Sequence, residues 1–142
     1  GVQVNFVADE AVIKIDRRLL PGEELETVIA GYQSMLDDLA RQHPEVIASM
    51  EKPMLQDWPF QTEASSPLVT LSCDILRSMQ RDNSVCGVPF CSDASKFGRL
   101  GIPTILFGPG SIDQAHAAVE YVECSQVEEA LRFYTEVARR FV

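Results

Sequence analysis

The chain has 142 residues, of which 46% are hydrophobic and 23% charged, enough apolar material for the core of a globular protein. Its formal net charge of −9 excludes nucleic acids and anionic membranes as partners, because both are bound by clustered Lys and Arg. No apolar run approaches the roughly 18 to 20 residues of a membrane-spanning helix. The four cysteines have no metal-site spacing and are typical of reduced thiols, so the composition predicts a cytoplasmic protein.

The first third of the chain has the pattern of a hairpin followed by a helix. Apolar residues alternate with polar or small ones over residues 2–7 and again over 11–15, which predicts two antiparallel strands. Pro21-Gly22 is a turn signal, and apolar residues then recur at helical spacing as far as His43-Pro44, where proline ends the helix. The residues of this predicted apolar stripe are Leu25, Val28, Ile29, Tyr32, Leu36 and Leu39.

The middle of the chain contains the predicted domain boundary. Residues 46–50 have the pattern of a further strand. The irregular stretch 56–64 mixes aromatic residues with proline, which is typical of a crossing between two domains, and we place the boundary between residues 62 and 63. Ser66-Pro67 then favours the start of a helix, since serine is a good N-cap and proline fits the first turn.

The last part of the chain alternates predicted strands and helices. Residues 85–90 have the pattern of a short strand, and Ser92-Asp93 caps a helix that ends at Gly101. Residues 102–107 form an unbroken apolar run, which is typical of a strand buried on both faces, and an amphipathic helix covers 127–141. This order of elements predicts an α/β fold.

The loop that follows the apolar run carries the strongest candidate site. Gly108-Pro109-Gly110 is either a tight turn or a source of backbone donors for a carboxylate or a developing oxyanion. His116 is either a metal ligand or a hydrogen-bonded structural residue. Glu120 either orients the imidazole of His116 or is a solvated acid. Because one histidine does not hold a catalytic metal, any metal site here needs ligands from elsewhere.

Two further charged residues are candidates for contact with a substrate. Arg18 is either a bidentate clamp for a carboxylate or a solvated charge at the end of a strand. Asp93 is explained structurally as part of a helix N-cap. The chain has neither a Gly-x-Ser-x-Gly elbow nor a glycine-rich phosphate loop of the common types, so the sequence favours neither a serine triad nor a nucleotide site.

Several stretches, in this order, carry a resemblance to a known family. They are Asn5-Phe6-Val7, Ile15-Asp16-Arg17-Arg18-Leu19-Leu20-Pro21-Gly22, Val88-Pro89-Phe90-Cys91-Ser92-Asp93-Ala94, Leu100-Gly101-Ile102-Pro103-Thr104-Ile105-Leu106-Phe107-Gly108-Pro109-Gly110, Gln114-Ala115-His116 and Glu120-Tyr121-Val122. The set resembles the C-terminal portion of the acetylornithine deacetylase and succinyl-diaminopimelate desuccinylase family of zinc metallohydrolases. Aminoacylases and zinc carboxypeptidases are relatives within that family. The resemblance covers nearly the whole chain.

The resemblance implies two parts with different roles. Residues 1–62 would be part of a ferredoxin-like α+β lid, which also serves as a dimerisation domain, so a homodimer is expected. Residues 63–142 would be the C-terminal part of a zinc-peptidase-like α/β catalytic domain.

The resemblance also implies roles for individual residues. His116 corresponds to the last ligand of a pair of zinc ions, for which cobalt can substitute. Asn5 and Arg18 correspond to lid residues that reach the substrate, with Arg18 taking its carboxylate. The loop Gly108-Pro109-Gly110 lines the pocket, and Asp93 sits in a Ser-Asp-Ala signature. The other ligands and the general-base glutamate are expected upstream of this segment, which therefore contains no catalytic residue of its own.

The implied activity is hydrolysis of the amide bond of N-acyl amino acids or small peptides by a longer enzyme, with the isolated segment inactive. A desuccinylase or carboxypeptidase type of hydrolase is an alternative within the same family. A non-catalytic dimerisation or interaction module is a competing hypothesis, motivated by the missing ligands and by an exposed strand edge in the lid. A small α/β domain that binds a carboxylate ligand without metal is a third.

Overall fold

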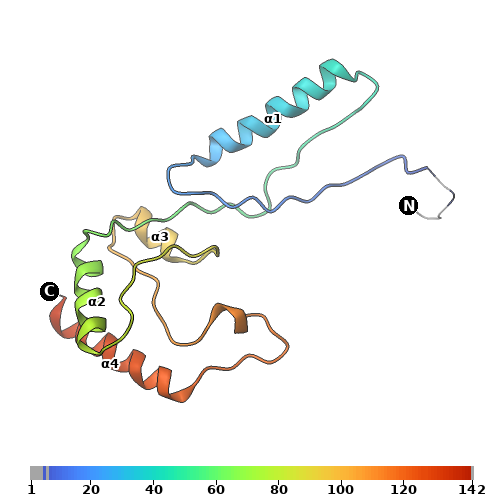
Figure 1. The fold of residues 1–142 in the computed structure, drawn as a ribbon. Coiled ribbons are helices and arrows are strands. Elements are labelled where there is room, and N and C mark those ends of the chain that lie inside the picture. Colours follow the sequence, from blue (N-terminus) through green and yellow to red (C-terminus); the bar gives the residue numbers. More distant parts are fainter. Residues whose placement is uncertain (1–4, 6, 142) are drawn as a thin grey trace. The chain divides into compact units, whose positions relative to one another are not determined.

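The computed structural model describes residue 5 and residues 7–141, and in this part of the chain it contains four α-helices, one short 3-10 helix and no β-strand (Figure 1). The elements are α1 (Leu25–Gln42), α2 (Pro67–Ser78), α3 (Ala94–Arg99), η1 (Ile112–Gln114) and α4 (Cys124–Arg140). The contacts divide the chain into two compact units, Gly1–Ser49 and Met50–Val142, and each is described by itself.

The first unit is built around α1, flanked by extended segments. The predicted helix is confirmed, because α1 begins directly after Glu24 and ends just before His43. Each residue of the predicted apolar stripe is half-buried and no residue of α1 is fully buried. The turn before the helix is held by Glu23, whose carboxylate accepts the Leu20 N–H at 2.7 Å and pairs with Arg17 at 2.5 Å.

The core of the second unit lies where α2 packs against α4 (Figure 1). Ile75 of α2 and Phe133 of α4 are its most deeply buried large side chains, with 0% and 1% of their surface exposed. Phe107 stacks on Phe133 with ring centroids 3.9 Å apart. The core therefore joins the two helices to the segment that leads into the candidate site. Its buried apolar residues are Leu68, Val69, Ile75, Ala94, Ala130 and Phe133.

Residues that precede α2 pack against later parts of the same unit. The Phe60 ring lies so close to Gly98 of α3 that a Cβ at position 98 would come within 2.6 Å of two ring carbons. The Thr62 hydroxyl donates a hydrogen bond to the Thr104 carbonyl at 2.5 Å. These contacts tie the start of the second unit to α3 and to residues 102–107.

The prediction of an α/β fold is wrong for the part of the chain that the structure describes. The segments 11–15, 46–50, 85–90 and 102–107 contain no strand, and neither does the described part of 2–7, of which residues 2–4 and 6 lie outside the described residues. A strand exists only where its N–H and C=O groups pair with another strand, and an apolar run supplies no such partner.

The segment 102–107 illustrates this difference. Its carbonyls at Thr104 and Phe107 accept hydrogen bonds from the side chains of Thr62 and Tyr134 instead of from a neighbouring strand. Ile102 and Leu106 are 48% and 42% exposed, where a doubly buried strand would cover them. The prediction of a buried strand over residues 102–107 is therefore wrong, because this segment pairs with side chains and is partly exposed.

The helices α2 and α3 begin at the predicted start signals, although the Ser66 side chain makes no capping hydrogen bond and α3 ends at Arg99, before the predicted end at Gly101. Ser66 precedes α2 with Pro67 as its first residue, and the Ser92 hydroxyl accepts the Ala94 N–H at the start of α3. The domain boundary between residues 62 and 63 stays a prediction. Among the described residues, no helix combines the length and the apolar composition that crossing a bilayer requires.

Candidate functional site

The Gly108-Pro109-Gly110 loop is fastened to α4 at both of its ends. The Tyr134 hydroxyl donates to the Phe107 carbonyl at 2.6 Å, and the Gln126 side-chain oxygen accepts the Gly110 N–H at 2.8 Å. Gly110 has φ +92°, a left-handed conformation that glycine adopts without steric cost. The loop is thus a turn with fixed hydrogen bonds, and the Gly110 N–H already has an acceptor.

The chain continues from this loop through η1 to His116. The Ser111 hydroxyl accepts the Asp113 N–H at 3.2 Å and caps η1. His116 then has φ +61°, which is uncommon for a residue with a side chain. Its backbone N–H donates to the Glu120 carboxylate at 2.6 Å. Glu120 therefore contacts the main chain of His116 and not its ring, which differs from the orienting contact to the imidazole that we considered.

In this region, the described residues include the imidazole of His116 but not the several ligands that a metal site needs. His116 is exposed, and its ring makes no hydrogen bond or ion pair among these residues. No group of three or more His, Cys, Asp or Glu that could hold a metal ion is found within residue 5 and residues 7–141. Since a zinc site needs three or four protein ligands, His116 does not make such a site with the described residues alone.

An open cavity of about 500 Å³ lies beside the glycine loop. Gly108, Pro109 and Gly110 form one wall, and the C-terminal end of α2 and the first turns of α4 form the others. Arg81 and Glu129, which both line it, pair with each other. His116 is not among the lining residues, so the cavity and the imidazole are separate features of the same loop region.

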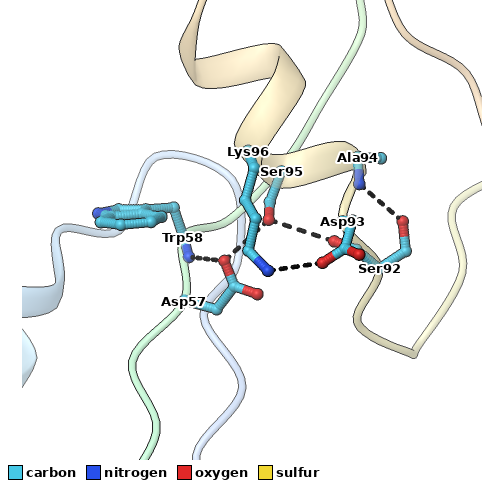
Figure 2. A network of polar contacts seen from close by, with 7 residues as sticks. All are labelled: Asp57, Trp58, Ser92, Asp93, Ala94, Ser95 and Lys96. Atoms are coloured by element: carbon cyan, nitrogen blue, oxygen red, sulfur yellow. Dashed lines mark hydrogen bonds and ion pairs between the residues drawn. The ribbon is translucent and has the colours of Figure 1, made fainter.

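Asp93 belongs to a polar network at the start of α3, shown in Figure 2. Its exposed carboxylate pairs with Lys96 at 2.6 Å, and this contact raises the pKa of Lys96. Next to it, the buried Ser95 donates its hydroxyl to Asp57 at 2.8 Å, and the Trp58 N–H donates to the same carboxylate oxygen at 2.9 Å. Arg99 covers the Trp58 ring at 4.0 Å. The network clamps residues 57–58 onto α3.

Asp57 is the charged centre of this clamp. Partial burial acts to raise the pKa of its carboxyl group, but the Ser95 hydroxyl, the Trp58 N–H and the charge of Lys96 outweigh burial, so the pKa lies below its usual value. Asp57 was not a candidate from the sequence, because it lies in a stretch without periodicity and its partner Ser95 is 38 residues away.

The two candidates of the first unit are both exposed. Asn5 lies in a turn. Arg18 grips both carboxylate oxygens of Asp16 at 2.8 Å, and its hydrogen bond lowers the pKa of Asp16. This fork geometry is the one in which arginine binds any carboxylate. Arg18 and Asn5 belong to the first unit, whereas Asp93, the glycine loop and His116 belong to the second.

Comparison with known proteins gives the family. The model of Peptidase family M20/M25/M40 matches residues 19–140, and the chain belongs to this family. Acetylornithine deacetylase of Buchnera aphidicola is 26% identical over 141 residues, which are 99% of this chain and 35% of that protein. N-acetyl-L-citrulline deacetylase of Xanthomonas campestris is 25% identical over 142 residues, which are 100% of this chain and 36% of the relative.

The name of a third relative describes a different substrate. N-formyl-4-amino-5-aminomethyl-2-methylpyrimidine deformylase of Halalkalibacterium halodurans is 26% identical over 149 aligned residues, covering 96% of this chain and 34% of the relative. The chain thus spans about a third of the length of these relatives. No solved structure matches it. The resemblance seen in the sequence is confirmed at the level of the family.

Proposed function

We propose that this chain supplies the C-terminal wall of the active site of a metal-dependent amidohydrolase that cleaves N-acyl amino acids. The observation that carries the proposal is the exposed imidazole of His116, which lies on a loop fastened to α4 in a chain of the M20 family. The names of the relatives support an acyl group on nitrogen as the target, because they describe two deacetylases and a deformylase.

The proposed cofactor is a pair of zinc ions, to which His116 contributes one nitrogen ligand. Such ions lower the pKa of a bound water and polarise the amide carbonyl. The remaining ligands and the general-base glutamate are proposed to come from other parts of the complete enzyme, since the described residues gather no further ligands around His116.

The other candidates have proposed roles in binding the substrate. Arg18 would take the carboxylate of the amino acid in the fork with which it now holds Asp16. The loop Gly108-Pro109-Gly110 would line the pocket through its shape, because the Gly110 N–H is already donated to Gln126. Asn5 would reach the substrate from the lid, and Asp93 would support the pocket through α3, whose first turn it joins to Lys96.

The test is replacement of His116 in the complete enzyme. His116→Ala should lower kcat/KM for N-acetyl-L-ornithine or N-acetyl-L-citrulline by more than the roughly 10- to 100-fold that a change next to a metal ligand costs. The zinc content, measured by elemental analysis, should fall in parallel. His43→Ala is the matched control, because His43 is the other histidine of this chain and lies at the end of α1. Full activity and full zinc content in His116→Ala would overturn the proposal.

A second candidate function, self-association through the first unit, is favoured by the exposed apolar side chains of that unit. Ile13 is 83% exposed, Ile15 is 65% exposed and Ile47 is 99% exposed. Exposed apolar side chains of this size can be covered by another protein, in keeping with the lid-mediated homodimer implied by the family resemblance.

Sedimentation of the purified chain tests this candidate. We expect a dimer that dissociates when Ile13 and Ile47 are both changed to Ser. Leu131→Ser is the control, since Leu131 is 66% exposed but lies on α4 of the second unit. A monomeric wild-type chain, or a dimer that the two substitutions leave intact, would contradict self-association through the first unit.

A further inference from the structure

The backbone of His116 has a conformation that needs local support. Its φ of +61° places it in the left-handed region, where the Cβ of an L-residue crowds the following carbonyl oxygen. Histidine adopts this conformation more often than most residues, but unlike glycine it has a Cβ and adopts it at a steric cost. The conformation of His116 therefore requires contacts that compensate for its steric cost.

Hydrogen bonds on both sides of His116 provide such contacts. Before it, the Ala115 N–H donates to the Ile112 carbonyl at 3.0 Å, and after it the Ala117 N–H donates to the Gln114 carbonyl at 3.4 Å. The His116 N–H itself donates to Glu120 at 2.6 Å. This last bond is the shortest of the three and the only one to a charged acceptor, and charge-assisted hydrogen bonds are the stronger kind.

The contact leaves the histidine ring available. If a carboxylate were bonded to a ring nitrogen, a metal that binds the ring would have to displace it or share the ring with it. Glu120 instead accepts a hydrogen bond only from the main-chain N–H of His116. One of the two ring nitrogens can then bind a ligand while the backbone stays fixed.

We propose that Glu120 is a positioning residue, which fixes the left-handed main chain of His116 and so holds its imidazole ready to bind a metal. The metal part of this inference rests on the proposed function, whereas the main-chain part rests on the geometry alone. Glu120 touches neither the substrate nor the metal in this proposal.

Three variants of the complete protein separate the possible roles of Glu120. Glu120→Ala removes the acceptor, and Glu120→Gln keeps an acceptor oxygen but removes the charge. Glu128→Ala is the control, because it removes an equal charge from an exposed position of α4 whose side chain has no hydrogen bond among the described residues.

The first measurement is hydrogen exchange of the His116 amide, followed by NMR with selective ¹⁵N-histidine labelling. Loss of a hydrogen bond to a charged group should speed exchange roughly tenfold or more in Glu120→Ala. Glu120→Gln, which keeps a weaker neutral acceptor, should exchange at a rate between those of the wild type and Glu120→Ala, and Glu128→Ala should match the wild type. The His43 N–H, which donates to the Leu39 carbonyl at 2.8 Å, gives an internal reference in every variant. Unchanged exchange in Glu120→Ala would overturn the main-chain role.

The second measurement is the rate at which the zinc-loaded protein loses zinc to excess EDTA. Loss should be roughly 10- to 100-fold faster in Glu120→Ala, and Glu120→Gln should restore most of the wild-type rate. Wild-type zinc retention in Glu120→Ala would contradict the positioning role even if amide exchange had increased. A wild-type protein that binds no zinc would contradict the proposed function and, with it, the metal part of this inference. The exchange experiment would still decide the main-chain part.

Discussion

Asp57 shows how a single side chain can join two segments that are distant in sequence. Its carboxylate accepts one hydrogen bond from Ser95 and one from the N–H of its own neighbour Trp58. Because these contacts hold the pKa of Asp57 below its usual value, the folded state binds a proton at this carboxyl less readily than the unfolded chain does. The stabilisation is complete above the ordinary carboxyl pKa of about 3.9 and is lost as the pH falls through the lowered pKa of the folded state.

Acid should therefore loosen the contact between residues 57–58 and α3. Trp58 is the only tryptophan of the chain and is held under Arg99, so its fluorescence reports on this contact. In the wild type we expect the emission to change as the pH falls from about 5 to about 2. In Asp57→Asn, which keeps an acceptor oxygen but does not titrate, the change should be much smaller.

Asp82→Asn serves as the control for this experiment. The pKa of Asp82 is also lowered, first by the Ser84 hydroxyl and then by the Ser84 N–H, but Asp82 has no contact with Trp58 or Ser95 among its hydrogen bonds. The Trp58 emission of the Asp82→Asn protein should therefore change with pH as it does in the wild type. An acid transition of equal size in Asp57→Asn would show that another group controls the environment of Trp58.

At the scale of elements, α4 holds the candidate site in place. One face of the helix buries Ala130 and Phe133 in the core, while Gln126 and Tyr134 reach the glycine loop. Tyr134 also packs edge-on against the Phe107 ring at 5.9 Å between centroids. The position of the loop therefore depends on the packing of α4 against α2.

Removal of one hydroxyl group tests this dependence. Tyr134→Phe deletes the hydrogen bond to the Phe107 carbonyl and keeps the ring, so the free energy of unfolding should fall by about 0.5 to 1 kcal/mol. Urea denaturation followed by circular dichroism measures the change. Tyr32→Phe is the matched control, since the hydroxyl of this α1 residue makes no hydrogen bond among the described residues, and it should leave the midpoint unchanged. Equal effects of the two substitutions would contradict an anchoring role of Tyr134.

The helices could be predicted from the sequence because their signals are local. The spacing from Leu25 to Leu39 and the stop at Pro44 lie within one segment. Pro67 fits the first turn of α2 by its own backbone geometry, and Ser92 accepts the N–H of Ala94, only two residues away. The sheet prediction failed because apolar alternation describes one strand, whereas a strand also needs a partner, which no local pattern specifies.

The candidate site was only partly predictable for the same reason. His116, Glu120 and the glycine loop stand out by residue type and position. Their anchors do not, because Gln126 and Tyr134 lie 16 and 27 residues from the atoms that they bind. Tyr134 lies within the predicted amphipathic helix, and its ring packs against Phe133, but the apolar pattern gives no indication of the bond formed by its hydroxyl.

At the scale of the whole molecule, much apolar surface is uncovered in both units. Val7 and Ile47 in the first unit and Met54 in the second expose nearly all of their surface, at 97%, 99% and 102%. The chain spans about a third of the length of its relatives in the M20 family, and the function proposed for it is that of a complete enzyme. This exposed apolar surface is compatible with both proposals, a wall of an active site and a surface for self-association. The His116 substitution tests the first, and the joint substitution of Ile13 and Ile47 tests the second.

The close approach of Phe60 to Gly98 restricts which sequences this fold accepts. Any residue other than glycine at position 98 would place its Cβ 2.6 Å from the Phe60 ring, less than the separation that real Cβ atoms show. The aromatic ring and the missing side chain therefore form a complementary pair, and a larger residue at 98 requires the Phe60 ring to move or a smaller residue at 60. In a library randomised at positions 60 and 98, we expect the residues found in folded variants to be correlated between the two positions.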